Sequence, residues 1–234
     1  MDKITSLVIS DVHIGSKGCN SKAIFKALKK IDYDRLILVG DIIDGWLFKK
    51  YKKFTSDHTK LIRLLLKISQ EKEIVWISGN HDEFLRKYTP IQIGKIKIAD
   101  EFKEGSAWFS HGDLYDGVVK LKWLGFLGSI GYDLAIVIDR FAKKIGSKKS
   151  LSKFLKDNVK AAISFVVDFE NEMVRQAKKR DCSIVICGHI HKPEDKIIDS
   201  TRYLNCGDWV ENKSYIIYDY YPSAGQQKFS LHVY

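Results

Sequence analysis

The sequence predicts an α/β protein in which short buried strands alternate with helices. Five short apolar runs, each rich in Ile, Val or aromatic residues, lie at 7–9, 35–39, 74–77, 107–109 and 183–187. Runs of this length, bounded by polar residues, are typical of strands buried on both faces. Amphipathic helical patterns lie between some of these runs, which favours an α/β arrangement over an all-helical or all-strand one.

The helices and the C-terminal strands are predicted from their hydrophobic periods. The segments 21–30 and 57–69 both place apolar residues at three-to-four spacing, and Ser56 or Asp57 is suited to cap the second helix. Residues 203–234 alternate apolar and polar side chains, so we expect antiparallel strands there.

One segment departs from this alternation. The strand pattern disappears between residues 117 and 180, and residues 158–177 have the spacing of a long amphipathic helix. Residues 123–141 are apolar and aromatic. We therefore expect a single domain over residues 1–234 that carries a helical insert at 117–180.

Composition limits the class of protein. The chain has 234 residues, a formal net charge of +10 and four cysteines, none of them in a C-x-x-C pair. The charge favours an anionic partner such as a nucleic acid, an anionic lipid surface or a phosphorylated small molecule. We expect free thiols in place of a disulfide framework or a zinc knuckle. We also expect a cytoplasmic protein, because no signal peptide and no apolar run long enough for a membrane span are evident.

A short polar cluster follows each of the five predicted strands. The residues of these clusters that suit metal binding or acid–base chemistry are Asp11, His13, Asp41, Asp44, Asn80, His81, His111, His189 and His191. In open α/β sheets the carboxyl ends of the strands converge on one crevice, so we expect these side chains to meet. Imidazole, carboxylate and amide oxygen suit Mn, Fe, Zn, Co or Ni, and the set exceeds what one ion needs. It favours two ions about 3.5–4 Å apart with a shared carboxylate.

A single Asp or His at a strand end is usually a capping or turn residue, and the case for a site depends on five such clusters in succession. His58 and His232 match no cluster, and we interpret both as ordinary surface or half-buried histidines. No Ser or Cys nucleophile with an adjacent base is evident. Direct attack by water is therefore favoured over a covalent intermediate.

The order D-x-H, GD-x-x-D, GNH-D, H-G-D and G-H-x-H, between residue 4 and about residue 191, resembles that of the calcineurin-like metallophosphoesterases. The resemblance implies a two-sheet α/β/β/α sandwich with a helical cap insertion. It also implies a first metal held by Asp11, His13, Asp41 and His191, with Asp41 bridging to a second metal held by Asn80, His111 and His189. His81 would be the catalytic histidine, oriented by Asp44. Position 45 is Gly, where many phosphatases of the family have Arg.

A closer resemblance is to the UDP-2,3-diacylglucosamine diphosphatase-like branch. The segments 10–19, 38–46 and 207–211 and the helical insert are similar to that branch. The resemblance implies cleavage of a lipid-linked pyrophosphate, giving a lipid monophosphate and UMP in lipid A biosynthesis, with two divalent ions such as Mn2+. Studied members with this activity have Arg where this chain has His81. The alternative is a metallophosphodiesterase that acts on another nucleotide or on nucleic acid.

The basic charge is concentrated in the predicted insert. Residues 117–160 hold ten Lys or Arg against three Asp, a net charge of +7. Lys153, Lys156 and Lys160 share one helical face, which is either an ordinary solvated face or a surface that binds substrate phosphate or an anionic membrane. A non-enzymatic adaptor is the third hypothesis, but such a protein would be expected to have lost ligands, and every metal position here is filled.

Overall fold

The computed structural model describes residues 2–46, 54–115 and 149–234, with side chains in the last range described from residue 164. The chain divides into two compact units. The larger unit comprises Met1–Asp113 and Met173–Tyr234, and the smaller one comprises Leu114–Glu172.

The larger unit contains two β-sheets. The seven-stranded sheet has the order β12 (Gln226–Val233), β11 (Ser214–Tyr221), β1 (Ile4–Ile9), β2 (Arg35–Val39), β3 (Glu73–Ile77), β5 (Ile96–Ala99) and β4 (Ile91–Ile93). The five-stranded sheet has the order β6 (Glu101–Glu104), β7 (Ala107–Ser110), β8 (Ile184–Cys187), β10 (Thr201–Asn205) and β9 (Glu194–Ile198). Strands β1, β2, β3 and β5 run parallel, as do β7, β8 and β10. The two parallel sets carry the predicted strand-end clusters.

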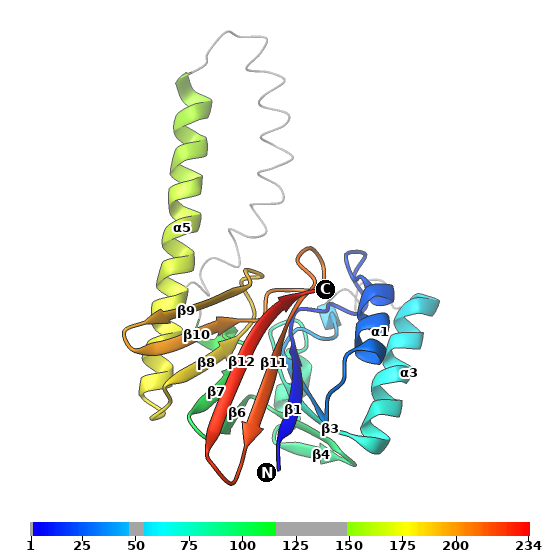
Figure 1. Ribbon diagram of the computed structural model, residues 1–234. Helices are drawn as coiled ribbons and strands as arrows, with labels where there is room; N and C mark the ends of the chain where they lie inside the picture. Colours follow the sequence, from blue (N-terminus) through cyan, green and yellow to red (C-terminus); the bar gives the residue numbers. More distant parts are fainter. Residues whose placement is uncertain (1, 47–53, 116–148) are drawn as a thin grey trace. The chain divides into compact units, whose positions relative to one another are not determined.

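The side chains of the central strands alternate between two hydrophobic cores, one on each face of the larger sheet. Leu36 and Leu38 of β2 pack in the core beneath helices α1 (Ser21–Lys30) and α3 (Ser56–Glu71), which cover one face of the larger sheet (Figure 1). Ile37 and Val39 point the other way, into a second core that also contains Phe109 and Ile186 of the smaller sheet. Because successive side chains of a strand point to opposite faces, β2 needs apolar residues throughout.

The structure confirms the α/β class and the two sheets, and it confirms all five predicted strands. The prediction for residues 203–234 was partly wrong. Strands β11 and β12 pair antiparallel, but β10 lies in the other sheet, parallel to β8 and antiparallel to β9. Strands β4, β5, β6 and β9 were not predicted.

Helix α3 begins one residue earlier than expected, and its N-cap is Thr55, not Ser56 or Asp57. The Thr55 hydroxyl accepts a hydrogen bond from the His58 amide at 3.2 Å, and the Thr55 amide donates to the His58 ring at 3.4 Å. This reciprocal pair is a capping box in which histidine takes the position usual for Glu or Gln. His58 is only 6% exposed, so the interpretation of this residue as surface or half-buried was wrong.

The smaller unit contains most of helix α5 (Lys149–Lys178), which includes the long helix predicted at 158–177. Residues 116–148, and with them the apolar segment 123–141, lie outside the described residues. The side chains of Lys153, Lys156 and Lys160 do too. The insert at 117–180 therefore stays a prediction. No described helix combines the length and apolarity needed to cross a bilayer.

A buried ion pair connects the two sheets of the larger unit. The Arg35 guanidinium, on β2, donates two hydrogen bonds to the Glu104 carboxylate, on β6, at 2.9 and 2.6 Å. It donates a third to the Ser6 hydroxyl at 2.9 Å. Arg35 is 5% exposed, so its charge depends on Glu104 for compensation.

We predict that Glu104→Ala lowers the free energy of unfolding by about 3 kcal/mol, because it leaves the Arg35 charge buried without its carboxylate. Urea denaturation of the full chain measures this. The control is Lys97→Ala, which breaks a pair with Glu73 whose side chains are 55% and 36% exposed. That change is expected to cost less than about 1 kcal/mol. Equal losses in the two variants would contradict the assignment.

Candidate metal centre

The predicted ligands come together at the carboxyl ends of five strands. Two backbone hydrogen bonds connect the loops after β1 and β2, from Asp11 N to Gly40 O at 3.1 Å and from His13 N to Asp41 O at 2.9 Å. In the other sheet, Gly188 N donates to His111 O at 3.2 Å, which connects the loops after β7 and β8. The structure therefore brings the predicted clusters together.

The backbone adopts an uncommon conformation at five of these residues. The dihedral φ is positive at Asp11 (51°), His13 (51°), Asp41 (54°), His189 (71°) and His191 (56°). This left-handed region is uncommon for any residue but glycine, and such conformations persist where the surrounding structure enforces them. Five of them in one place indicate a site selected for the positions of its side chains.

Two glycines are required by the close approach of the carboxylates. A Cβ atom at Gly79 would lie 2.2 Å from Asp41 Oδ1, and one at Gly188 would lie 2.4 Å from Asp11 Oδ2. Any larger residue at either position would push a carboxylate out of the site. The sequence pattern of glycine before Asn80 and before His189 follows from this constraint.

The first group of candidate ligands is Asp11, His13 and His191. Asp11 Oδ1 lies 3.1 Å from His191 Nε2 and 3.8 Å from His13 Nε2. The Nε2 atoms of the two histidines are 3.4 Å apart. Three donor atoms at these separations can bind one divalent cation between them.

Asp41 belongs to two further groups, one with Asp11 and His111 and one with His13 and His81. Its Oδ2 lies 3.4 Å from His111 Nε2 and 3.9 Å from His81 Nε2. Its Oδ1 accepts a hydrogen bond from the His81 amide at 2.8 Å. A carboxylate with ligand groups on both sides is suited to bridge two ions.

Asn80 and His189 are the two predicted ligands outside these groups. Asn80 is 7% exposed, and its buried Oδ1 has no hydrogen-bond partner among the described residues. The His189 amide donates to Asp11 Oδ2 at 3.1 Å, and its ring centroid lies 5.2 Å from that of His111. His189 therefore borders the group that contains His111.

The hydrogen bonding of His111 shows that a cation fits this site. His111 Nδ1 lies 2.9 Å from the Val39 carbonyl oxygen and must donate to it, so Nε2 carries the lone pair of the neutral ring. That nitrogen faces Asp41 Oδ2 and has no hydrogen-bond partner among the described residues, and neither has Asp11 Oδ1. Buried acceptors directed at one another are unfavourable unless a proton or a metal cation lies between them.

The pKa shifts of His111 and Asp41 also arise from the close approach of buried carboxylates and histidines. Burial would lower the pKa of His111, but the charges of Asp41 and Asp11 outweigh it and raise this pKa well above its usual range. Burial would raise the pKa of Asp41, but the histidines around it, His111 first, hold it below its usual range. The site thus favours added positive charge, which a divalent ion supplies.

His81 and Asp44 form a separate pair at the edge of this group. His81 Nδ1 lies 3.3 Å from Asp44 Oδ2, and the His81 side chain is 24% exposed. Burial would lower the pKa of His81, but the neighbouring Asp44 carboxylate and the charge of Asp41 outweigh it and raise this pKa. The Trp46 ring lies against the imidazole at a centroid distance of 4.3 Å, with the two ring planes tilted by 34°. The ring is held in place while its Nε2 faces the metal ligands.

Sequence reasoning missed the supporting residues of the site. Asp82 is fully buried and accepts hydrogen bonds from the amides of Gly79 and Ile42 and from the indole of Trp76. It thereby fixes the loops after β2 and β3 to each other. The signal was its place as the last residue of the GNH-D motif.

Arg86 and Asp113 form a second support. The Arg86 guanidinium donates twice to the Asp113 carboxylate, each bond 2.8 Å long, and once to the Ser78 carbonyl at 3.0 Å. This connects the loop after β3 to the H-G-D motif. The sequence positions of the arginines do not indicate which of them pairs with Asp113, so this support could not be predicted.

The chain is similar to several known proteins. It is 26% identical over 246 residues to the UDP-2,3-diacylglucosamine hydrolase of Porphyromonas gingivalis, covering 90% of this chain and 92% of that protein. Vacuolar protein sorting 29 from Cryptosporidium parvum has a TM-score of 0.48 at 12% identity, covering 99% of this chain and 98% of the other. A predicted phosphoesterase from Streptococcus pneumoniae has a TM-score of 0.42 at 15% identity, covering 99% of each chain. These two structural likenesses are too loose to bear on function.

The family model for calcineurin-like phosphoesterases matches residues 4–193. This range contains every strand of the two parallel sets except β10, and all nine candidate metal-centre residues. The chain belongs to the calcineurin-like phosphoesterase family.

Proposed function

We propose that this phosphoesterase holds two divalent metal ions and cleaves the pyrophosphate of UDP-2,3-diacylglucosamine, giving a lipid monophosphate and UMP. The observation that carries the metal-dependent reaction is the set of buried acceptors, Asp11 Oδ1, Asn80 Oδ1 and His111 Nε2, that lack hydrogen-bond partners among the described residues. The substrate is supported by the resemblance to the hydrolase of Porphyromonas gingivalis.

The residues divide between two ions that share Asp41. Asp11, His13 and His191 would hold the first ion with Asp41, and Asn80, His111 and His189 would hold the second with it. When bound, two such ions lower the pKa of a water molecule and neutralise phosphoryl oxygens. The ligand chemistry suits Mn2+, and also Zn2+, Fe2+, Co2+ or Ni2+.

His81 and Asp44 would act on the leaving group. The Asp44 carboxylate, 3.3 Å from His81 Nδ1, would hold the proton on that nitrogen, so that Nε2 would face the reacting phosphate and donate a proton to the departing oxygen. Asn80, whose amide is next to the ligand set, would contact a phosphoryl oxygen. Every role here requires only the side chains at the ends of β2 and β3.

A second candidate is a metallophosphodiesterase that acts on another nucleotide or on nucleic acid. The observation that favours it is His81 itself, in the position where the resembled diphosphatases have arginine. Against nucleic acid, the basic segment 117–160 is rich in apolar residues, as a lipid-facing surface would be. Under the first candidate, the protein would be cytoplasmic and would contact the inner face of an anionic membrane.

For His81 we predict that His81→Ala lowers kcat about 10²–10⁴-fold while the metal content stays near normal, because the residue moves a proton and is not a required ligand. Steady-state kinetics with metal analysis measures both quantities. His232→Ala, at an exposed histidine on β12, is the matched control and should leave both unchanged. Loss of metal in His81→Ala would instead make His81 a ligand, as its distance to Asp41 allows.

For the substrate we predict hydrolysis of UDP-2,3-diacylglucosamine in the presence of Mn2+, abolished by a chelator, at a higher kcat/KM than for generic phosphodiesters. Charge reversal at Lys153, Lys156 and Lys160 should lower this activity and weaken binding to anionic vesicles, since each lysine near such a surface contributes about 1 kcal/mol. Activity on a small chromogenic phosphodiester should survive.

The control is charge reversal at three exposed lysines of the larger unit, Lys67, Lys87 and Lys228, which should not affect the lipid substrate selectively. Preference for a nucleotide without acyl chains would favour the second candidate. No effect of the insert lysines on either substrate would remove the support for a lipid-facing insert.

A further inference from the structure

The loop between β10 and β11, residues 206–213, is bonded to the backbone of two candidate metal ligands. The Trp209 amide donates to the Asp11 carbonyl oxygen at 3.1 Å. The side-chain amide of Asn212 donates to the His191 carbonyl oxygen at 2.8 Å. The loop lies beyond the end of the family-model match, and it contains none of the candidate ligands. It therefore supports the metal centre from outside the motifs that define the family.

Asp208 gives this loop its shape. The residue is fully buried, and its Oδ1 accepts hydrogen bonds from the backbone amides of Val210, Glu211 and Asn212. An aspartate that accepts from amides two and three residues ahead fixes a tight turn. Its Oδ2 accepts from the Asn212 side-chain amide, the same group that donates to the His191 carbonyl. The Asp208 carboxylate thus sets the direction in which the Asn212 side chain reaches His191.

His191 has less side-chain packing to hold it than its neighbours in the first group of ligands. Its side chain is 42% exposed, whereas those of Asp11 and His13 are 0% and 8% exposed. Its φ of 56° lies in a region that persists only where the surrounding structure enforces it. The direction of the His191 ring therefore depends strongly on how its own backbone is held, and Asn212 bonds that backbone directly.

We propose that Asp208 and Asn212 are positioning residues that hold His191 in place for the first metal ion. Asp208 orients the Asn212 amide, Asn212 holds the His191 carbonyl, and His191 Nε2 is thereby kept 3.1 Å from Asp11 Oδ1. This inference rests on the two-ion site proposed above. Residues that orient a metal ligand typically change metal affinity by about 10–100-fold when they are replaced. The loss should fall on the first ion, since His191 is a ligand of that ion.

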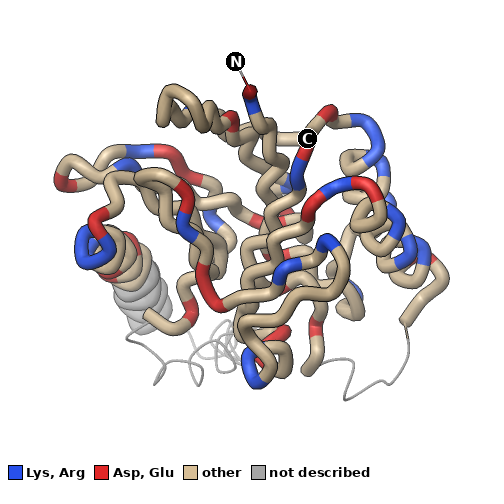
Figure 2. Tube along the Cα trace, turned by 90° about the horizontal axis from the view of Figure 1, so that it is seen from below, with Lys and Arg blue, Asp and Glu red and all other residues tan. Residues whose placement is uncertain are grey.

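The test variant is Asn212→Ala, which removes the donor to His191 but keeps the backbone amides that bond Asp208. Asn212 is only half-buried, so its side chain is not part of the hydrophobic core. Figure 2 shows acidic and basic residues along many of the described elements, and a change of charge among them would alter the electrostatic field at a metal site. Replacing asparagine by alanine leaves the net charge unchanged.

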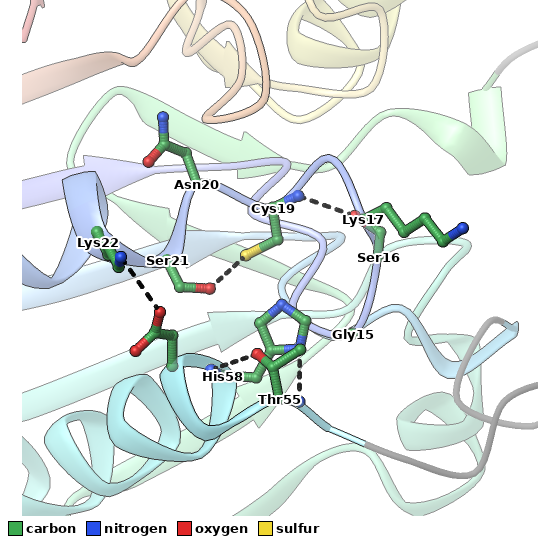
Figure 3. A pocket seen from close by; sticks show the side chains of 10 residues that line it. Gly15, Ser16, Lys17, Cys19, Asn20, Ser21, Lys22, Thr55 and His58 are labelled. Atoms are coloured by element: carbon green, nitrogen blue, oxygen red, sulfur yellow. Dashed lines mark hydrogen bonds and ion pairs between the residues drawn. The ribbon is translucent and has the colours of Figure 1, made fainter.

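The matched control is Asn20→Ala, the same substitution at a residue that caps a helix. The Asn20 side chain accepts from the Ala23 amide at the start of α1. It lines a pocket whose lining residues include no candidate ligand (Figure 3). Loss of this cap should lower the urea midpoint of unfolding. The control therefore shows whether metal affinity merely follows overall stability.

Zn2+ binding to the metal-free full chain is followed by NMR of the histidine rings, with the free Zn2+ concentration set by a competing chelator. The rings of His13 and His191 report on the first ion, and those of His111 and His189 report on the second. We expect Asn212→Ala to raise the free Zn2+ concentration at half-saturation about 10–100-fold for the first pair of rings. The value for the second pair should stay nearly unchanged.

Asp208→Asn should act in the same direction, because it replaces the oxygen that accepts from the Asn212 amide with a donor. Asn20→Ala should change neither affinity. Unchanged affinity in Asn212→Ala, an equal loss at both ions, or the same selective loss in Asn20→Ala would overturn the proposal while leaving the two-ion site intact. Histidine rings of the native chain that do not respond to Zn2+ would overturn the two-ion site itself, and the proposal with it.

Discussion

In the metal centre of this protein, two buried carboxylates and the ring of His111 lie together, and each carboxylate needs positive charge beside it. His111 donates through Nδ1 to the Val39 carbonyl, so in the neutral ring its other nitrogen presents a lone pair to the Asp41 carboxylate. Asp11 adds a second buried carboxylate, which is fully inaccessible to solvent. In an interior that excludes water, this arrangement is costly unless positive charge lies between the groups. The remaining features of the larger unit serve to hold the arrangement in place.

The candidate ligands are held in place by uncommon backbone conformations, and hydrogen bonds between the loops keep those conformations fixed. Five of the candidate residues have a positive φ, and the loops that carry them are joined by backbone hydrogen bonds across β1 and β2 and across β7 and β8. Asp82 connects the loops after β2 and β3 through three donors. The two sheets that supply these loops are themselves joined by Arg35 and Glu104. Local strain at the site is thus balanced by bonds outside it.

Much of this could be predicted from the sequence, because the central strands are apolar on both faces and end in polar clusters. The strand β2 is a continuous buried run, and Asp41 follows it directly. By contrast, β4 is three residues long with every side chain exposed, so it leaves no pattern of burial to detect. The burial of His58 could have been found, since it precedes Leu61 and Leu65 at helical spacing. The position of the N-cap at Thr55 could not have been predicted, because it depends on the hydrogen bond that the His58 ring accepts from the Thr55 amide.

The central claim is that two divalent ions share the Asp41 carboxylate. The most direct test is equilibrium Mn2+ binding to the metal-free chain, followed by electron paramagnetic resonance, for the native protein and for Asp41→Asn. Asparagine keeps the shape of the residue and tolerates its positive φ, so only the charge is lost. The account predicts two ions per chain with a magnetically coupled spectrum in the native protein, and at most one uncoupled ion and no hydrolysis in the variant. Two coupled ions and full activity in Asp41→Asn, or a single ion in the native protein, would contradict it.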